Sequence, residues 1–537
     1  MIIRWLRFPR RSRSRCAALG LFLLAALPAM RAQIPAPATA PAVGLWLPSI
    51  FGDHMVLQRG KPFALWGRGR AGSTVRVQTG GVERTCLVDA TGRWRMTIPP
   101  LSAHTPFSVQ VSDEVREIRY QDVILGDVWL GGGQSNMEWK LQDSVGGREA
   151  IAQADLSKLR VFLQQPQGVD AQADDVLNGQ WVVSTPQSAE SFWGVPFFFA
   201  RKLLIDTGEP IGIIQAAVGG TVIECWIPRE VLGSDLSQER GIVDYHASIP
   251  RDYEAEYLRW QHDVRSFNTD RAAAIAAGRA PAPNNPWIHW GPPGPRYPKR
   301  PFALYQGMIA PLQPYALRGV LWYQGEGNVY RYQSYERLLK GLIAVWRQGW
   351  NEPQLPFLIV QMPGAPKHEA SRSHWPDLRE QQQRVADRVP NVYLCTTIDL
   401  GDPSNIHPRD KLPVGERLAL LAERYVEGRG EVHPEGPRPE RITVTGSRVT
   451  IKFAHAPGPL QLSGGNAFAL AGADGLFKPA IAAIIGNDSV LVECPDVPGP
   501  LQVRCAWEPF PEGFLRDANG LPTPPFSRAV PSATPAE

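Results

Sequence analysis

The chain has 537 residues, of which 43% are hydrophobic and 20% are charged, as in a typical globular protein. Its 50 Gly and 51 Pro residues favour many turns and short strands, and the composition excludes a coiled coil, a collagen-like repeat and a wholly disordered chain. A chain of this length is expected to fold into about three or four domains.

Residues 1–32 are predicted to be an export signal. They hold seven Arg and no acidic residue, and an apolar run over 17–27 precedes small residues at Ala29 and Ala32, where the signal would be cut. Eleven apolar residues are too few for a bilayer span, which needs about 20, although an uncleaved anchor is the alternative. No later segment is long and apolar enough to span, so the mature protein is expected to be periplasmic or secreted.

The excess of positive charge comes from this signal. The whole chain has 56 basic and 52 acidic residues, and without its first 32 residues 49 basic residues stand against the same 52 acidic ones. The mature chain is therefore slightly acidic, and its charge gives no reason to expect nucleic acid as a partner.

The rest of the chain divides into four segments. A Pro- and Ala-rich linker at 33–44 leads into short alternating runs over 45–122, which predict a small N-terminal β-sandwich domain. Over 123–432 apolar strands alternate with amphipathic helices, a pattern that predicts a doubly wound, mostly parallel α/β sheet. Polar, Pro- and Trp-rich sequence at 229–300 is interpreted as an insertion near the functional site. Short strands return at 433–537 and predict a second small β domain with a tail.

The cysteines give little information about function. None has the C-x-x-C spacing of a zinc or redox site. Cys494 and Cys505 flank a Pro-Gly-Pro turn and could form a disulfide across a hairpin. A metallohydrolase is a further option, but the chain has no H-E-x-x-H motif and no clustered His and Asp set to support it.

Ser135 is the first candidate for chemistry. It lies in the segment GGGQSNM at 131–137, directly after the strand predicted at 123–130. Glycines allow the backbone to turn sharply, so that a serine hydroxyl can project above the sheet edge while backbone N–H groups bind an oxyanion. The plainer alternative is that the segment is only a Gly-rich turn.

His407 is the candidate base for this serine. A nucleophilic serine needs a base, usually His, and a group that orients it. Nine of the ten His lie in polar loops or in the outer domains, but His407 follows the strand predicted at 392–400 and precedes a helix. Because the carboxyl ends of parallel strands share one edge of the sheet, His407 is expected to face Ser135. A loop His without a role is the alternative.

Two further loops at strand ends offer hydrogen-bond donors. Gly219 and Gly220 follow the strand predicted at 211–218, and the segment QGEGN at 324–328 follows another strand. Each loop alone is weak support, since turn glycines and hydrogen-bonded polar residues are common. Four such loops at four strand ends predict one site.

The sequence as a whole resembles the sialate O-acetylesterase family of SGNH-type hydrolases. The resemblance extends through nearly the whole mature chain and rests on these segments in order: LPSIFGDHMVLQRGKP, ILGDVWLGGGQSNMEW, VGGTVIECW, FALYQGMIAPL, RGVLWYQGEGN, WPDLREQQ, DLGDPSNIHPRDKLPVGERLAL, LAGADGLFKPA and NGLPTPPF. It implies an SGNH-hydrolase-like sheet flanked by two small β domains, and an esterase that removes acetyl groups from sugar hydroxyls without a cofactor.

The resemblance also implies roles for individual residues. By position, Ser135 would be the nucleophile, His407 the base and Gly220 a donor to the oxyanion. Gln324 or Asn328 would be the side-chain donor, and the sequence does not distinguish these two.

The third member of the triad departs from the common SGNH pattern, which has Asp three residues before the His. That position is Ser404 here. Asp402 is the preferred acid, Asp399 is the other nearby carboxylate, and a Ser–His dyad assisted by a backbone carbonyl is also open.

Substrate contacts are predicted from charge and from aromatic residues beside the motifs. Arg379 and Arg409, together with Lys411, could attract the carboxylate of a sialic acid, or they could form structural pairs. Four aromatic residues could stack on a sugar ring or pack in the core: Trp139, Trp226, Trp322 and Tyr323.

The predicted function is therefore a secreted carbohydrate O-acetylesterase whose partner is an O-acetylated sugar or glycan. The acetyl group could lie on sialic acid, or on a plant polysaccharide such as xylan. A non-catalytic glycan-binding protein is the alternative from another class, and the presence of both Ser135 and His407 argues against it.

Overall fold

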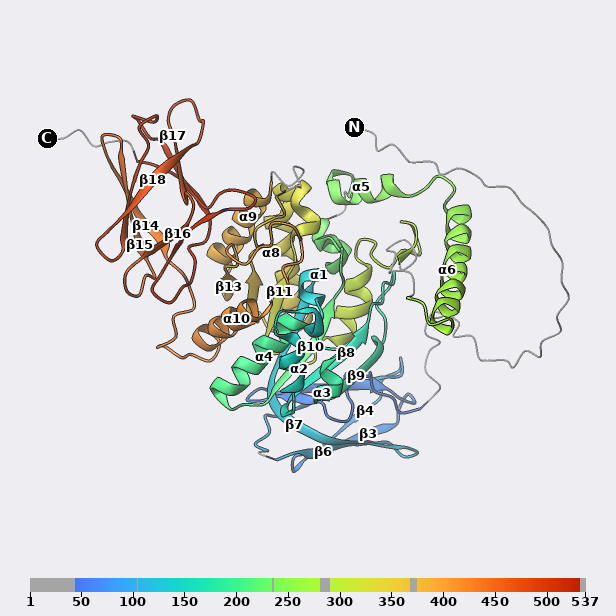
Figure 1. Ribbon diagram of the computed structural model, residues 1–537. Coiled ribbons are helices and arrows are strands. Elements are labelled where there is room, and N and C mark those ends of the chain that lie inside the picture. The colour runs from blue at the N-terminus through green and yellow to red at the C-terminus, as the bar shows by residue number, and fades with distance from the viewer. Residues whose placement is uncertain (1–43, 104, 234–235, 281–289, 368–373, 532–537) are drawn as a thin grey trace, which may run out of the picture. The chain divides into compact units, whose positions relative to one another are not determined.

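The computed structural model describes residues 44–103, 105–233, 236–280, 290–367 and 374–531 (Figure 1). The predicted export signal and nearly all of the predicted linker lie outside these residues. Among the helices described, none combines the length and the apolar character needed to cross a membrane.

A seven-stranded path forms the centre of the fold. Its strand order is β13-β12-β11-β7-β10-β8-β9, and every neighbouring pair is parallel except β8 with β9. This confirms the prediction of an α/β fold built on parallel strands. The strands are β7 (Glu117–Gly133), β8 (Leu156–Gln165), β9 (Leu177–Ser184), β10 (Ile211–Ala217), β11 (Gly319–Tyr323), β12 (Phe357–Val360) and β13 (Val392–Cys395).

Both faces of this sheet are covered. Val320 and Trp322 of β11 pack into one hydrophobic core, whereas Leu321 and Tyr323 pack into another, as the two-residue period of a strand requires. Parallel strands buried on both faces are continuous apolar runs, which is why the sequence identified them. Helices α8 (Tyr332–Gly349) and α9 (Trp375–Arg388) contribute to the first core, and α4 (Gly194–Thr207) and α10 (Leu412–Tyr425) to the second (Figure 1).

The N-terminal strands continue into the central sheet through β7. The first part of this 17-residue strand pairs with β6, and its last part pairs with β10 and β11. The boundary predicted between 122 and 123 therefore falls inside one strand. The other strands are β1 (Val56–Gln58), β2 (Phe63–Arg68), β3 (Thr74–Thr79), β4 (Val82–Leu87), β5 (Arg93–Ile98) and β6 (Phe107–Ser112).

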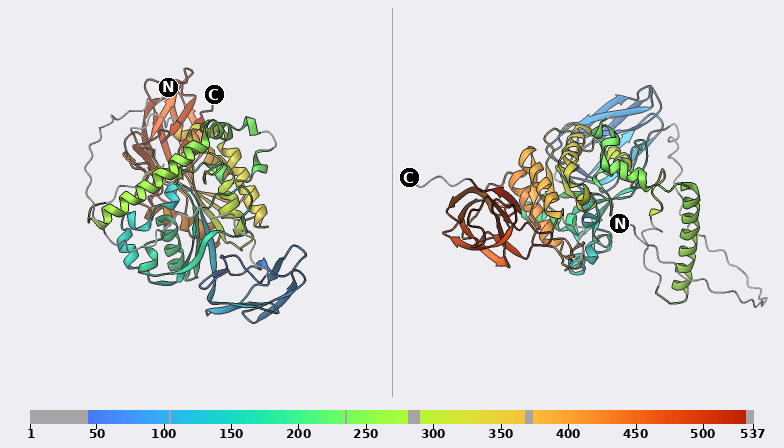
Figure 2. Two further views of the ribbon diagram at one scale, coloured as in Figure 1. Left: turned by 90° about the vertical axis from the view of Figure 1, so that its right-hand side faces the viewer. Right: turned by 90° about the horizontal axis from the view of Figure 1, so that it is seen from above.

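The chain ends in antiparallel strands over residues 438–529, here called the C-terminal β region. Seven of them form one sheet in the order β14-β15-β19-β18-β17-β20-β22, and β16 pairs with β21 (Figure 2). Cys494 and Cys505 are buried free thiols, so the possible disulfide is not formed. The strands are β14 (Arg438–Thr445), β15 (Arg448–Ala454), β16 (Gln461–Gly464), β17 (Phe468–Ala471), β18 (Lys478–Ile485), β19 (Ser489–Glu493), β20 (Gln502–Cys505), β21 (Gly513–Arg516) and β22 (Phe526–Ala529).

Further helices complete the described fold. Helix α1 directly follows β7, and two helices lie in the interval predicted as an insertion at 229–300. The remaining helices are α1 (Ser135–Glu138), α2 (Gly147–Ala152), α3 (Pro186–Ala189), α5 (Arg240–Ser248) and α6 (Tyr253–Ala276).

Candidate active site

Ser135 and His407 meet at the carboxyl edge of the central sheet. Ser135 is the first residue of α1, and His407 lies in the loop between β13 and α10. The distance between Ser135 Oγ and His407 Nε2 is 2.8 Å, although the two residues are 272 positions apart. The ring of Trp139 stacks on the imidazole with centroids 5.5 Å apart and planes 22° apart. The predicted juxtaposition is therefore present in the structure.

Gly133 explains how the chain turns before the serine. Its φ is +136°, and a Cβ at this position would lie 2.1 Å from the carbonyl oxygen of Tyr323 on the neighbouring strand. Only glycine fits so close to that backbone. The end of β7 can consequently lie flat against β11 and deliver Ser135 to the sheet edge.

The loop after β10 borders the serine. A Cβ on Gly219 would lie 3.3 Å from the Cβ of Ser135, and Gly220 has a φ of +67° that forms the tight turn. The N–H of Gly219 donates to the carboxylate of Glu138. Burial raises the pKa of Glu138, while the Gly219 N–H opposes this rise. Gly219 thus borders the serine and its N–H already binds a carboxylate, and the role of Gly220 as an oxyanion donor stays a prediction.

A buried network surrounds Asn136, a residue that the sequence analysis did not single out. Its Nδ2 donates to Glu326 Oε1 at 2.5 Å and to the carbonyl oxygen of Ile406 at 3.1 Å. Its Oδ1 accepts from Lys411 Nζ at 2.6 Å. Burial lowers the pKa of Lys411 to about 7, against the opposing charge of Glu326. Asn136 and Glu326 lie inside the GGGQSNM and QGEGN motifs, which was the available signal for them.

Gln324 and Asn328, the two predicted side-chain donors, are both fully buried. Gln324 Nε2 donates to the carbonyl oxygen of Thr221 at 3.2 Å and to Asn328 Oδ1 at 2.8 Å. Asn328 Nδ2 donates to Glu224 Oε2 at 2.9 Å. These bonds fasten the loop after β11 to the loop after β10. The structure therefore corrects the prediction, because neither amide is presented to a substrate.

The two candidate acids make different contacts. Asp402 Oδ1 accepts from the N–H of Ser404 at 2.8 Å, from its hydroxyl at 2.7 Å and from the N–H of Asn405 at 3.1 Å. The bonds from Ser404 lower the pKa of Asp402. Asn405 Oδ1 in turn accepts from the N–H of His407 at 2.9 Å. Asp402 thus folds the loop that carries the histidine.

Asp399 is held by two arginines. Arg417 binds both of its carboxylate oxygens at 2.7 and 2.8 Å, and Arg516 of the C-terminal β region binds one of them at 2.6 Å. Burial alone would raise the pKa of Asp399, but the bonds and charges of both arginines lower it. These two ion pairs indicate that Asp399 has a structural role.

Arg379 and Arg409 occupy very different surroundings. Arg379 is fully buried and donates to four backbone carbonyls, so it cannot attract a substrate carboxylate, contrary to the prediction. Burial lowers its pKa to about 9. Arg409 is exposed, and its Nε donates to the carbonyl oxygen of Asp143 at 2.9 Å. A substrate contact at Arg409 stays a prediction.

The four aromatic candidates for a sugar contact lie in different surroundings. Trp226 and Trp322 are fully buried and pack edge to face, and Tyr323 is 1% exposed, so these three belong to the core. Trp139 instead stacks on His407. Only Trp139 of the four predicted aromatic residues therefore contacts the candidate catalytic pair.

The end of the predicted insertion supplies a cation. Lys299 Nζ donates to the carbonyl oxygen of Gly219 at 2.7 Å and lies 3.9 Å from the ring centroid of Trp290. Burial lowers the pKa of Lys299 to about 8. The insertion thus reaches the loop beside Ser135.

In the part of the chain that the structure describes, no cluster of three or more His, Cys, Asp or Glu side chains could hold a metal ion.

Comparison with known proteins shows which family the chain resembles. Residues 290–422 match the family described as carbohydrate esterase, sialic acid-specific acetylesterase. The chain is 26% identical to the sialate O-acetylesterases of Rattus norvegicus and Homo sapiens; the alignments cover 91% and 90% of this chain, and 95% and 92% of the relatives. A crystal structure of a carbohydrate acetylesterase from Xanthomonas citri matches with a TM-score of 0.75 and 30% identity, over 90% of this chain and 99% of that one.

Fold, site and similarities together define an esterase, a member of the hydrolases. The resemblance found in the sequence motifs is thereby confirmed. The chain belongs to the family of carbohydrate acetylesterases that includes the sialate O-acetylesterases.

Proposed function

We propose that the chain is a secreted serine esterase that hydrolyses acetyl esters on sugar hydroxyls. The observation that carries the serine mechanism is the 2.8 Å contact between Ser135 Oγ and His407 Nε2. A nucleophile and a base at this distance at the carboxyl edge of a parallel sheet are the arrangement that acyl transfer requires. The strand order around β7 supports an SGNH-type sheet, and the separate core of the C-terminal β region supports a domain at 433–537.

The reaction follows from these two side chains. Ser135 Oγ attacks the acetyl carbonyl carbon while His407 Nε2 takes the hydroxyl proton. The tetrahedral intermediate collapses, the C–O bond to the sugar breaks, and the imidazolium returns the proton to the sugar oxygen. Water then attacks the acetyl-serine with His407 again as base, which releases acetate and restores the hydroxyl.

Backbone N–H groups are the proposed oxyanion donors. We assign this role to Gly220 and to Ser135 itself, because the amides of Gln324 and Asn328 are buried in structural bonds. The Gly219 N–H is held by Glu138. The left-handed turn at Gly220 supports this assignment, because it redirects the backbone beside the serine.

Orientation of the base is assigned to two features. The stack with Trp139 fixes the plane of the imidazole, and Asp402 folds the loop that carries it. Asp402 is therefore proposed as the carboxylate that supports His407, mainly through the loop.

An O-acetylated sialic acid is the proposed substrate. Two cations lie on the loops that form the site: Lys299 donates to the carbonyl oxygen of Gly219, and the exposed Arg409, two residues after His407, donates to that of Asp143. Both can attract a sugar carboxylate. The names of the curated relatives support the same class.

The decisive experiment is acetate release by the purified wild type and the Ser135→Ala variant. The substrates are 9-O-acetylated sialic acid and acetylated xylan oligosaccharide. We expect release from the sialic acid, lost at least about 10³-fold in the variant. Release from xylan alone would reassign the substrate. Undiminished release by Ser135→Ala would refute the serine mechanism, and no release from either would favour a glycan-binding protein.

Secretion has its own test. The Arg-rich segment 1–32 carries this part of the proposal. In the native host, the intact mass of protein recovered outside the cytoplasm should lack this segment. A full-length cytoplasmic protein would contradict export.

A further inference from the structure

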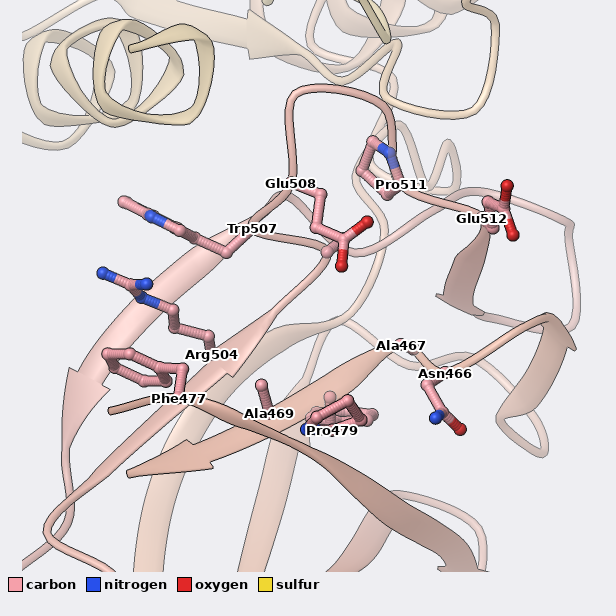
Figure 3. Close-up of a pocket in the computed structure, with 12 residues that line it drawn as sticks. Asn466, Ala467, Ala469, Phe477, Pro479, Arg504, Trp507, Glu508, Pro511 and Glu512 are labelled. Carbon is pink, nitrogen blue, oxygen red and sulfur yellow. The ribbon is translucent and has the colours of Figure 1, made fainter. Parts of the chain in front are cut away.

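A cavity lies in the C-terminal β region, away from Ser135. It has a volume of about 460 Å³, and its lining comes from β17, from the start of β18, and from β20 with the loop that follows it (Figure 3). Neither Ser135 nor His407 lines it. A volume of this size is typical of small-molecule sites, which span about 300–1,000 Å³.

One wall of the cavity is a stack of three side chains. Figure 3 shows Phe477, Arg504 and Trp507 one above the other. The Arg504 guanidinium carbon lies 3.6 Å from the ring centroid of Phe477 and 5.3 Å from that of Trp507. All three are half-buried. The guanidinium holds both rings in place by cation–π attraction, so the wall offers a rigid aromatic surface.

The other side of the cavity is polar. Glu508, Glu512 and Asn466 are exposed and supply two carboxylates and an amide, while small side chains such as Ala467 and Ala469 keep the space between open (Figure 3). Lys367 from outside the cavity pairs with Glu512, which fixes that carboxylate.

The backbone that carries Trp507 and Glu508 is held rigidly. Ala506 has a φ of +47°, a left-handed conformation that is unfavourable for a residue with a Cβ and is often retained at functional sites. Its N–H donates to the carbonyl oxygen of Ala467 at 2.8 Å. The buried Arg379 donates to the carbonyl oxygens of Glu508 and Pro509, each at 2.9 Å. The cavity is therefore formed before any ligand arrives.

This chemistry selects one ligand class. The carboxylates accept hydrogen bonds from hydroxyl groups, and the Asn466 amide accepts and donates them. Arg504 in the wall and Lys367 on Glu512 balance the charges of the two carboxylates, so the lining has no net charge that would select an ion. Aromatic surfaces cover the apolar C–H faces of a ring. We propose that this cavity binds a neutral sugar ring of the glycan whose acetyl groups are removed at Ser135. The inference rests on the proposed function, because that function supplies the glycan.

Such a site anchors the enzyme to its substrate chain. A polymer held at the cavity meets the serine at a raised effective concentration, whereas a small acetyl ester gains nothing from it. The cavity should thus lower KM for a glycan polymer and leave the hydrolysis of p-nitrophenyl acetate unchanged.

Binding is tested with the inactive Ser135→Ala protein by calorimetry, using xylohexaose and 3′-sialyllactose as probes. We expect at least one probe to bind, with Kd raised tenfold or more by adding Trp507→Ala or Glu508→Gln. Leu501→Ala and Asp496→Asn are matched controls, because both residues are exposed in the same region outside the cavity. Glu508→Gln is conservative and exposed, so it preserves the fold if Trp507→Ala does not. Equal affinity in cavity and control variants, or no binding of either probe, would overturn the inference.

Activity separates this inference from the proposed function. The cavity variants with an intact Ser135 should hydrolyse p-nitrophenyl acetate like the wild type. If the wild type releases acetate while no probe depends on the cavity, only the inference fails. If the wild type releases no acetate from any ester, the proposed function fails.

Discussion

The side-chain amide of Asn136 donates to the carbonyl oxygen of Ile406 at 3.1 Å, and so joins the residue after Ser135 to the residue before His407. The same amide is held by Glu326 and Lys411, both buried. Asn136 thus links the two loops that bring serine and histidine to 2.8 Å, without contacting either reacting atom.

Asn136→Ala should lower kcat more than it raises KM. The truncation removes the tie between the two loops and leaves the polar groups of Lys411 and Glu326 in the core without this amide, at a cost of about 1–3 kcal/mol in stability. We expect a fall in kcat of about 10- to 100-fold, measured as acetate release below the unfolding temperature. Gln142→Ala, an exposed amide on the nearby segment, is the control. Equal kcat in the two variants would show that catalysis does not need the hydrogen bonds of Asn136.

Lys411 should make stability depend on pH. Its pKa in the folded chain is about 7, below the ordinary value near 10.4, because burial disfavours the charge. Between these two values the unfolded chain binds more protons, so the contribution to the free energy of unfolding rises with pH, by at most about 1.4 kcal/mol per pH unit. Urea unfolding from pH 7 to 10 should show this rise in the wild type and a smaller one in Lys411→Met. If the free energy of unfolding changed with pH equally in the wild type and in Lys411→Met, the assignment of this pH dependence to Lys411 would be contradicted.

Asp399→Asn and Asp402→Asn form a matched pair on one loop. Asp399 is buried between Arg417 and Arg516, and removing its charge should lower the free energy of unfolding by about 3–5 kcal/mol. Since its pKa is lowered in the folded chain, this stabilisation is present above the unfolded pKa near 3.9 and is lost as the pH falls.

Asp402→Asn should be milder. Its carboxylate is exposed enough to be hydrated and bonds to its own loop, so we expect kcat/KM to fall less than about tenfold. A fall of about 10⁴-fold, as in triads whose acid is replaced by its amide, would instead make Asp402 the residue that orients His407.

Lys299→Met should change selectivity. The ammonium group beside Gly219 favours an anionic sugar, so kcat/KM for 9-O-acetylated sialic acid should drop about tenfold while that for p-nitrophenyl acetate stays near wild type. Lys158→Met, an exposed lysine that also donates to a backbone carbonyl, serves as the control. An equal loss on both esters would indicate that Lys299 only supports the loop.

The parallel sheet and the Ser135–His407 pair were predictable because each depends on local pattern. Apolar runs mark buried parallel strands, and residues that follow such strands gather at one edge. The direction of a polar side chain is not local. Gln324 and Arg379 stand in motifs that suggested contact with substrate, yet both point into the interior, where their partners come from distant loops. Asn136 was missed for the same reason.

The length of β7 has a consequence for how the chain can be divided. One uninterrupted strand pairs with β6 at its start and with β10 and β11 at its end. The backbone hydrogen bonding is therefore continuous from β6 to the sheet that carries Ser135. Exchanging the N-terminal strands for those of another protein, or deleting them, would remove strands that pair with β7, the strand that leads to Ser135. Homologous exchange in this family should therefore keep Glu117–Gly133 together with the strands that pair with it on both sides, and should avoid a junction at residue 122.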